Sequence, residues 1–274
     1  MLQEINTWAD YRSKVREFDA VLEYGRAVAS ALAGMTATTA RVGYGAQIFI
    51  KLLSHCVALR GMAADPNKRT SRELLDIPSL CAISRCVLEA HDAFEYIAGH
   101  EITDVERAFR VQLWELQDKT RLLKLVDRDD LRADIARRRT ALEAHEFFLA
   151  MPTRLQALLS ERLAKGDPPA FHLNQKTRCA ASGVNADWHN TVALQLAQHV
   201  HTLPTAMHQL FELQPDTPEA LRQMAMPLLI ALPLLARLIT AMEQLIPGRV
   251  PKPPSRTART MAVWRAVAEG RTRA

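Results

Sequence analysis

The sequence predicts an all-α protein, a multi-helix bundle of about seven to nine helices with no sheet. Ala, Leu, Arg and Glu dominate the 274 residues and only 10 are glycine. These four residue types lose little free energy on entering a helix. β-branched residues seldom alternate with polar ones, so the period-two pattern of a half-buried strand is missing. The hydrophobic content of 48% suffices for one sizeable core or two small ones.

Caps and turn residues divide the first half of the chain. Asp76 followed by Pro78, and Thr103 with Glu106 three residues later, have the pattern of helix N-termini. Turn residues fill positions 64–76. Spaced apolar residues between these points predict helices over residues 11–32, 38–62, 78–99, 103–126 and 129–149.

The second half of the chain divides in the same way. Pro152, Asn185 and Thr217 stand where helices begin. Residues 166–183 are the longest irregular stretch, and turn residues at both ends indicate a loop. The expected helices cover residues 152–166, 185–203 with a continuation to 213, 217–245, and 257–269.

One segment, Met224–Leu245, is apolar enough to resemble a membrane span. It contains Arg237 and two prolines, whereas a spanning helix needs about 20 clean apolar residues. We therefore expect a buried core helix and no membrane span. The polar N-terminus has no signal-peptide pattern, and none of the four cysteines stands in a CxxC pair. A cytoplasmic, reducing location is expected.

The net charge of +5 is concentrated at the C-terminal end. Residues 248–274 contain seven basic side chains against Glu269 alone, which gives +6 and leaves about −1 for residues 1–247. We expect a helical bundle domain over residues 1–247 and a basic, partly flexible tail with a short helix around Trp264. Such a tail could dock on a protein partner, a membrane surface or a nucleic acid.

The chain contains no HExxH, GxSxG, P-loop, GxGxxG or EF-hand sequence. This absence argues against most nucleoside-triphosphate, dinucleotide and metalloprotease functions. No cofactor and no metal are expected. Enzymes whose catalytic residues are scattered along the chain remain open.

The helix expected over residues 78–99 carries a polar stripe. Arg85, Glu89, Asp92 and Tyr96 lie within about 60° of one another on a helix, opposite the apolar face that contains Phe94. Arg85 and Glu89 are four residues apart and can form an ion pair. The pair either faces water, where it contributes little, or faces the bundle interior, where Arg85 could bind an anion such as a phosphate.

Four histidines are weaker candidates. His199 and His201 differ by about 200° on a helix, so only one of them can face inward and the two cannot share a metal. A structural histidine is the simpler interpretation of that pair. His55 has the pattern of a helix-packing residue, and His172 lies in the expected loop, where surface exposure is expected.

Two segments together resemble a family of uncharacterised bacterial helical proteins. They are LCAISRCVLEAHDAFEYI and, about a hundred residues later, ADWHNTVALQLAQHVHTLPTA. The family has an R-x-x-L-E helix, which matches Arg85, Leu88 and Glu89, and a later Leu-Ser-x-Tyr-Val-His helix, which matches Val200 and His201. The chain departs from the second pattern at residues 196–199. The resemblance covers residues 47–209 and implies that Arg85, Glu89 and His201 meet inside the bundle.

The family is in turn similar to HEPN domains, helical bundles that include metal-independent endoribonucleases of defence and toxin systems. Their signature is an Arg followed after four to six residues by a His, and Arg85 with His91 fits it. The resemblance implies that these residues assist attack of a ribose 2′-hydroxyl on its phosphate. On a continuous helix His91 lies about 120° from Arg85. The pair therefore requires a bend in the helix or a homodimer that completes the site.

Two functions follow as expectations. The first is a HEPN-like ribonuclease or nucleotide-binding protein of a defence or toxin–antitoxin type system, with RNA or a nucleotide as its partner. Its site residues would be Arg85, Glu89, His91 and His201. The second is a non-catalytic helical interaction or ligand-binding module.

Overall fold

The protein is an all-α bundle in the computed structural model, which describes residues 4–65, 76–201, 203–214 and 216–272. The described residues contain no strand, which confirms the expected fold class. They form twelve α-helices and one π-helix, η1. These are α1 (Trp8–Ala31), α2 (Ala40–Met62), α3 (Ile77–Phe94), η1 (Glu95–Gly99), α4 (Asp104–Leu123), α5 (Asp129–Glu143), α6 (Glu146–Leu149), α7 (Thr153–Ala164), α8 (Gln175–Ser182), α9 (Ala186–Val200), α10 (Pro204–Glu212), α11 (Pro218–Leu245) and α12 (Ser255–Ala268).

Three short helices explain why the described residues hold more helices than the expected seven to nine. Helix α8 lies inside residues 166–183, which were expected to form a loop. Helix α6 is separated from α5 by a break that the sequence pattern did not predict, and α10 is the continuation expected after residue 203, here a separate helix. Each of the three has fewer than ten residues, so periodicity over a longer window could not identify it.

The expected helix N-termini are confirmed where a polar cap begins the helix. The side chains of Asp76, Thr103, Asn185 and Thr217 each accept a hydrogen bond from the amide three residues later, at 2.8 to 3.2 Å. These bonds satisfy amides that have no partner within the helix. The expected turn region over residues 64–76 lies mostly outside the described residues.

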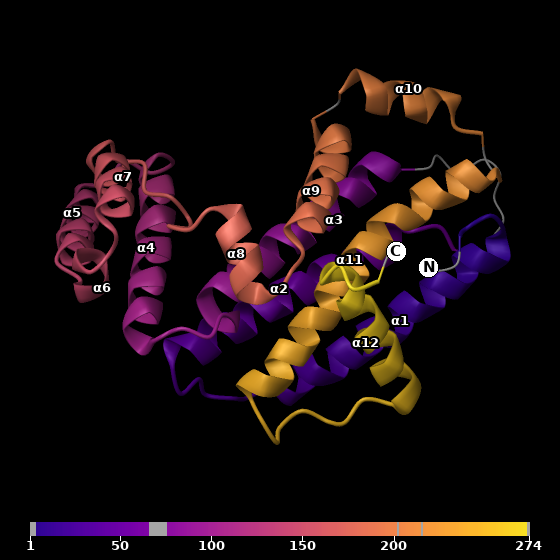
Figure 1. Cartoon of the computed structure of the whole chain (residues 1–274), viewed down its shortest axis with the longest axis horizontal. Coiled ribbons are helices and arrows are strands. Elements are labelled where there is room, and N and C mark those ends of the chain that lie inside the picture. The colour runs from indigo at the N-terminus through magenta and orange to yellow at the C-terminus, as the bar shows by residue number, and fades with distance from the viewer. Residues whose placement is uncertain (1–3, 66–75, 202, 215, 273–274) are drawn as a thin grey trace.

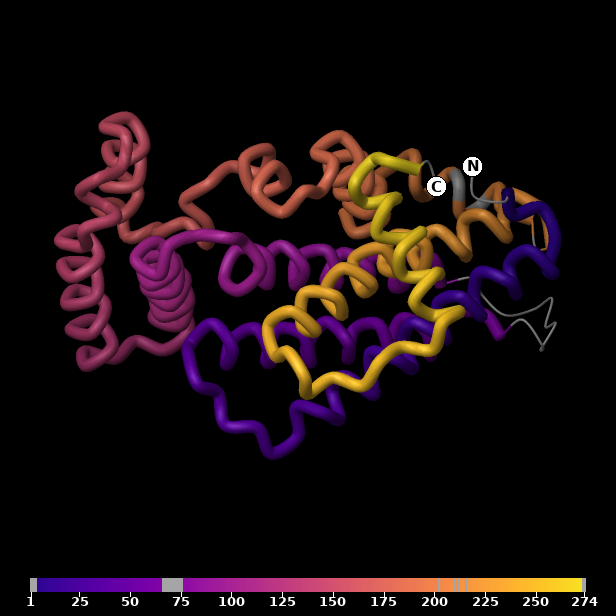
Figure 2. Tube along the Cα trace, turned by 60° about the horizontal axis from the view of Figure 1, so that its bottom comes forward, coloured from indigo at the N-terminus to yellow at the C-terminus, as the bar shows by residue number. Residues whose placement is uncertain are grey.

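The larger part of the molecule, here called the body, is built around α11 (Figures 1 and 2). Helices α1, α2, α3 and α12 pack on α11, and α9 packs on α3. Two of the described helices, α2 and α11, are long and apolar enough to cross a membrane by length and composition. Within α11, 72% of the apolar window is buried inside the protein, against 39% in α2. The composition of α11 is therefore explained by its place in the core.

The C-terminal residues form part of the body, which corrects the expected division at residue 248. Helix α12 packs on α1 and α11, and the Trp264 side chain is fully buried. The Trp264 indole N–H donates to Glu17 Oε2 at 2.7 Å. Met261 and Val267 share this buried face, while Arg256 and Arg259 lie on the exposed side. The basic residues Arg256 and Arg259 therefore lie on the exposed side of a helix that is anchored in the body. Arg273 lies outside the described residues.

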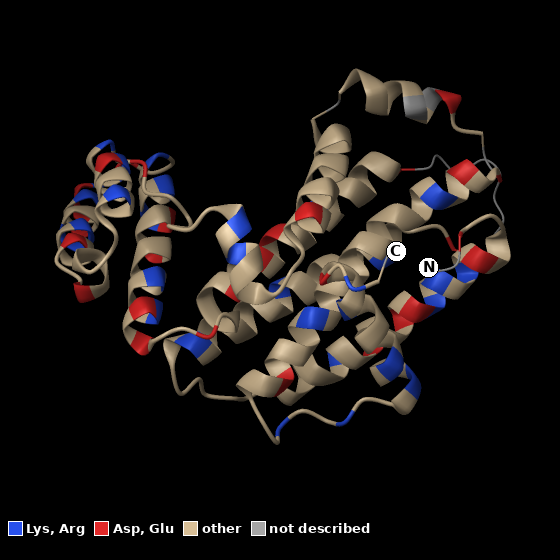
Figure 3. Ribbon diagram, in the orientation of Figure 1, with Lys and Arg blue, Asp and Glu red and all other residues tan. Residues whose placement is uncertain are grey.

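Helices α4, α5, α6 and α7 form a lobe at one end of the body (Figure 1). Helices α5, α6 and α7 pack against one side of α4 around a second, smaller apolar cluster. That cluster contains Phe109, Leu113, Leu142 and Phe148. The other side of α4 reaches the body, where Trp114 meets Tyr44 edge to face. Charged residues of both signs are frequent along the helices of the lobe, whereas the middle of α11 contains few (Figure 3).

Candidate functional site

Helix α3 does not end at Phe94 but continues as the π-helix η1. A π-helical turn widens the helix and is frequent at functional sites. Arg41 and Arg107 donate to carbonyl groups of residues 97, 98 and 100 at 2.9 to 3.0 Å, and Arg110 donates to the Tyr96 carbonyl at 3.0 Å. Cations are favourable at this end of a helix, so the three arginines hold η1 in place from α2 and α4.

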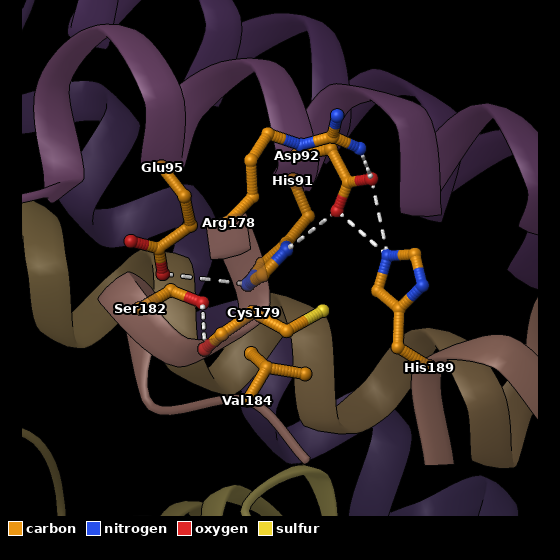
Figure 4. Close-up of a pocket in the computed structure, with 8 residues that line it drawn as sticks. All are labelled: His91, Asp92, Glu95, Arg178, Cys179, Ser182, Val184 and His189. Atoms are coloured by element: carbon orange, nitrogen blue, oxygen red, sulfur yellow. Dashed lines mark hydrogen bonds and ion pairs between the residues drawn. The ribbon is translucent and has the colours of Figure 1, made fainter. Parts of the chain in front are cut away.

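The turn before η1 carries a buried charged cluster (Figure 4). His91 is 1% exposed and lies between two carboxylates of its own helix. Its Nδ1 is 3.7 Å from Asp92 Oδ1, and its Nε2 is 3.5 Å from Glu95 Oε1. Neither ring nitrogen makes a hydrogen bond. His91 is therefore held between the two carboxylates by ion pairing.

Side chains from three other helices complete the cluster. His189 of α9 approaches Asp92 with its Nε2 2.9 Å from Oδ1, and Arg178 of α8 donates to Asp92 Oδ2 at 3.3 Å. Arg237 of α11 donates to Glu95 Oε1 at 3.3 Å. The cluster thus links α3 and η1 to α8, α9 and α11 through charge.

The cluster changes the protonation of its members. Burial opposes the protonated form of His91, but Asp92 and Glu95 outweigh it, so the pKa of His91 lies above its usual value. Burial also opposes ionisation of the two carboxyl groups. His189 and His91 outweigh that effect at Asp92, and His91 does so at Glu95, so both carboxyl pKa values lie below the usual range. The arrangement therefore favours the protonated form of His91 and the ionised forms of both carboxyl groups.

The cluster has the composition of an active site but not the geometry of one. The space among these side chains is about the size of one water molecule. Both ring nitrogens of His189 are engaged, Nε2 by Asp92 and Nδ1 by Gln175 at 2.5 Å, so it cannot act as a base without rearrangement. Burial raises the pKa of the Cys179 thiol to about 11. No group of metal ligands occurs among the described residues.

Of the residues proposed from the sequence, Arg85 and Glu89 meet each other, but neither His91 nor His201 joins them. Arg85 Nε donates to Glu89 Oε1 at 3.0 Å, and these side chains are 35% and 64% exposed. Arg85 also donates to the Ala193 carbonyl of α9 at 3.2 Å. Helix α3 is uninterrupted from Ile77 to Phe94, so the bend that would turn His91 toward Arg85 is absent there. His91 belongs to the buried cluster instead.

The other histidines are placed as follows. His201 lies exposed at the end of α9, whereas His199 is buried. Burial, followed by the Lys51 charge, lowers the pKa of the half-buried His55. His172 corrects the expectation of surface exposure, because its Nδ1 is 2.7 Å from the Tyr96 hydroxyl. Burial, with a smaller contribution from Arg110, lowers the pKa of His172 to about 4.

A basic cleft lies next to the buried cluster, between α4, α7 and residues 167–171. Arg121, Lys124, Arg162 and Arg178 line it, and Asp167 is the single carboxylate among its lining residues. It encloses about 750 Å³, part of it open to solvent. Arg178 forms the common wall, since it binds Asp92 on one side and lies 4.3 Å above the Phe171 ring. The cleft therefore has a cation at its base that is fixed by the buried cluster.

Sequence reasoning placed Asp92 on the polar stripe but missed its partners. Arg178 and His189 come from segments 86 and 97 residues away, and no spacing rule connects them. The usable signal was the Asp92 carboxylate on a helix with a strongly apolar face, since a carboxylate that becomes buried requires a cationic partner. Comparison of the chain with protein-family models, with curated proteins and with solved structures finds no match.

Proposed function

We propose that this protein is a non-catalytic helical ligand-binding module whose ligand carries phosphate groups and binds in the basic cleft. The observation that carries the proposal is the gathering of Arg121, Lys124 and Arg162 around the fixed guanidinium of Arg178. Clefts of several hundred Å³ with a few convergent polar groups are the usual small-ligand sites. Guanidinium groups match the oxygens of a phosphate with paired hydrogen bonds.

Charge in the cleft is only partly neutralised within the protein. Arg162 pairs with Asp167 at 2.6 Å, and Arg178 pairs with Asp92. Among the described residues, Arg121 and Lys124 have no carboxylate within ion-pair distance. The hydrogen bond from Arg162 lowers the pKa of Asp167, and Lys124 and Arg121 add to this effect. The C-terminus of α4 offsets about half a charge, so a positive excess remains for a ligand.

Binding is better supported than catalysis. The ribonuclease hypothesis needs Arg85 and His91 at one phosphodiester group, and here they lie on different sides of α3 with different partners. In the cleft, none of the lining residues is a histidine or cysteine that could transfer a proton near neutral pH. The ribonuclease function stays a prediction, with Arg85, Glu89, His91 and His201 as its residues.

Calorimetric titration of the full chain with pyrophosphate and with ADP tests the binding function. We expect binding that weakens as salt is added. Arg121→Gln should weaken it about tenfold, because one charge-assisted contact is lost. Asp167→Asn should strengthen it, because the single opposing charge disappears. Arg26→Gln, on the exposed side of α1, is the control. Absence of pyrophosphate binding, or equal binding by Arg121→Gln, contradicts the proposal.

The ribonuclease alternative has its own test. Wild-type protein and Arg85→Ala are incubated with total RNA and EDTA, and the products are separated on a gel. Cleavage by the wild type that disappears in Arg85→Ala favours the ribonuclease. Equal products from both, or none from either, leave the binding function as the better account.

A further inference from the structure

A second cleft lies at the opposite end of α4, where the N-terminal turn of α2 meets the N-terminal half of α4 and the last turn of α11. Arg41 and Arg107 line its polar side, and Val42, Val111 and Leu245 line its apolar side. It encloses about 1150 Å³, part of it open to solvent. The basic cleft of the proposed function involves residues 117–124 of α4. The two clefts therefore share no lining residue.

The polar side of this cleft holds two guanidinium groups without a carboxylate partner. Arg41 Nε donates to the Ala98 carbonyl at 2.9 Å, and Arg107 donates to the Ile97 and His100 carbonyls at 3.0 and 2.9 Å. The two groups thus stand side by side on η1. Neither has a carboxylate within ion-pair distance among the described residues, whereas the neighbouring Arg110 is paired with Glu106 at 2.6 Å.

Burial and the neighbouring positive charges both disfavour the charged form of Arg107. Burial, followed by the charges of Arg41 and Arg110, lowers the pKa of Arg107 to about 10. Arg107 is only 7% exposed, and its Nε is buried without a hydrogen-bond partner. The end of η1 supplies about half a negative charge, which is less than the two positive charges beside it. Asp104 lines the cleft and opposes them in part.

The N-terminus of α2 adds to this positive potential. Helix α2 is 23 residues long and has no acidic residue in its first turn. The Thr39 hydroxyl accepts from the Val42 amide at 3.2 Å, which leaves the amides of Ala40 and Arg41 without an acceptor inside the helix. Free amides at a helix N-terminus attract anions. Arg41 and the backbone around it therefore face the cleft with donors only.

The rest of the lining is apolar. Val42, Ala108, Val111 and Leu245 cover the wall next to these donors. An inorganic anion would leave this wall in contact with water, whereas a ligand with an apolar chain would cover it. We propose that this cleft binds an amphipathic anion, with a carboxylate or phosphate head group at Arg41 and the α2 N-terminus and an apolar chain along Val111 and Leu245.

Calorimetric titration of the full chain with decanoate and decyl phosphate tests this site, with decanol and acetate as probes of the chain and the head group alone. We expect one or both amphipathic anions to bind, and decanol and acetate to bind at least about tenfold more weakly. The head group that binds more tightly identifies the class of ligand. Failure of both anions to bind, or decanol binding as tightly as decanoate, overturns the proposal.

Three variants locate the binding. Arg41→Gln should weaken decanoate or decyl phosphate binding about tenfold, while Arg41→Lys, which keeps the charge, should restore part of it. Ala108→Trp, at an exposed position in the lining, should block the cleft without disturbing the core. Arg26→Gln, on the exposed side of α1, should bind like the wild type. Unchanged binding in both Arg41→Gln and Ala108→Trp overturns the proposal, and leaves the basic cleft to be judged by pyrophosphate alone.

Discussion

At the scale of single residues, the buried charged side chains of this protein contact one another in a single cluster. His91 lies between Asp92 and Glu95, and these carboxylates also pair with Arg178 and Arg237. Removing one member leaves its partners buried and unpaired, which is more damaging than exchanging a whole pair for apolar residues. The cluster therefore constrains which side chains can change singly.

Two other histidines of the same region have a lowered pKa, the buried His100 and the partly buried His172. Burial, with a smaller effect of Arg110, lowers the pKa of His100 and of His172 to about 4. The His100 Nδ1 is 2.7 Å from Arg110 and can only accept there. A group whose pKa is lowered on folding binds its proton more readily in the unfolded state, so it destabilises the fold as the pH decreases.

We expect the melting temperature to fall as pH decreases from about 6.5 to about 4. His100→Gln keeps an acceptor for Arg110 but cannot titrate, so it should reduce this slope, and the double variant with His172→Gln should reduce it further. Thermal melts followed by circular dichroism at several pH values provide the measurement. His201→Gln, at the surface, is the control. An unchanged slope in the double variant would show that other groups cause the acid loss.

The sequence predicted which residues share a face of α3, but not which part of that face is buried. Asp92 and Tyr96 share a stripe with Arg85 and Glu89, as the helical period predicts. Helix α9 contacts both halves of the stripe, at Arg85 through Ala193 and at Asp92 through His189. Only Tyr96, whose hydroxyl lies next to His172, is fully buried. Whether a polar residue faces water therefore depended on elements a hundred residues away, which no local pattern contains.

At the scale of elements, local signals predicted helix starts and distant contacts decided the irregularities. Thr103 and Thr217 cap their helices with their own side chains, so a few adjacent residues suffice to predict the cap. The π-helix η1 instead depends on Arg41 of α2 and on Arg107 and Arg110 of α4. Its existence could not be inferred from residues 95–99.

Gly99 lies in η1 next to the Glu95 carboxylate, where an added side chain would require that carboxylate to move. A Cβ at this residue would lie 2.2 Å from Glu95 Oε2. Gly99→Ala should therefore displace the Glu95 carboxylate from Arg237 and lower the free energy of unfolding by about 1–3 kcal/mol. Urea denaturation measures this change. Gly61→Ala, in α2 with nothing within 4 Å of the added Cβ, is the matched control, and should be neutral or stabilise by up to about 1 kcal/mol. Equal effects at both positions would contradict the steric explanation.

At the scale of the whole molecule, the two ends of the chain close the body together. Helix α12 lies against α1. The Trp264 indole N–H donates a hydrogen bond to Glu17, and Lys14 Nζ lies 5.7 Å from the centroid of the indole ring. The spacing of Met261, Trp264 and Val267 could have indicated a buried face. The excess of basic residues in the same segment suggested a solvated tail instead. The basic residues correctly predicted that one side of α12 is exposed, but they carried no information about its buried side.

A chain that ends at residue 247 should be strongly destabilised. It loses the Trp264 side chain from the core, which alone is worth about 3–5 kcal/mol. Urea denaturation and binding of a hydrophobic dye measure the loss of stability and the exposed apolar surface. The triple variant Lys252→Gln, Arg256→Gln, Arg259→Gln removes exposed charges and leaves the buried face intact. It should unfold within about 1 kcal/mol of the wild type. A stable truncated chain would show that α12 is dispensable for the body.

The two apolar clusters differ in how far apart their members lie in the sequence. The lobe cluster draws on residues 109–163 only, whereas the body cluster joins residues near both ends, from Ile5 to Val267. Contacts between near residues form faster than contacts that close a long loop. During synthesis from the N-terminus, the lobe can form while α11 and α12 have yet to emerge. The apolar faces of α1, α2 and α3 have no packing partner until α11 and α12 emerge. The nascent chain therefore exposes the future core of the body for longer than that of the lobe.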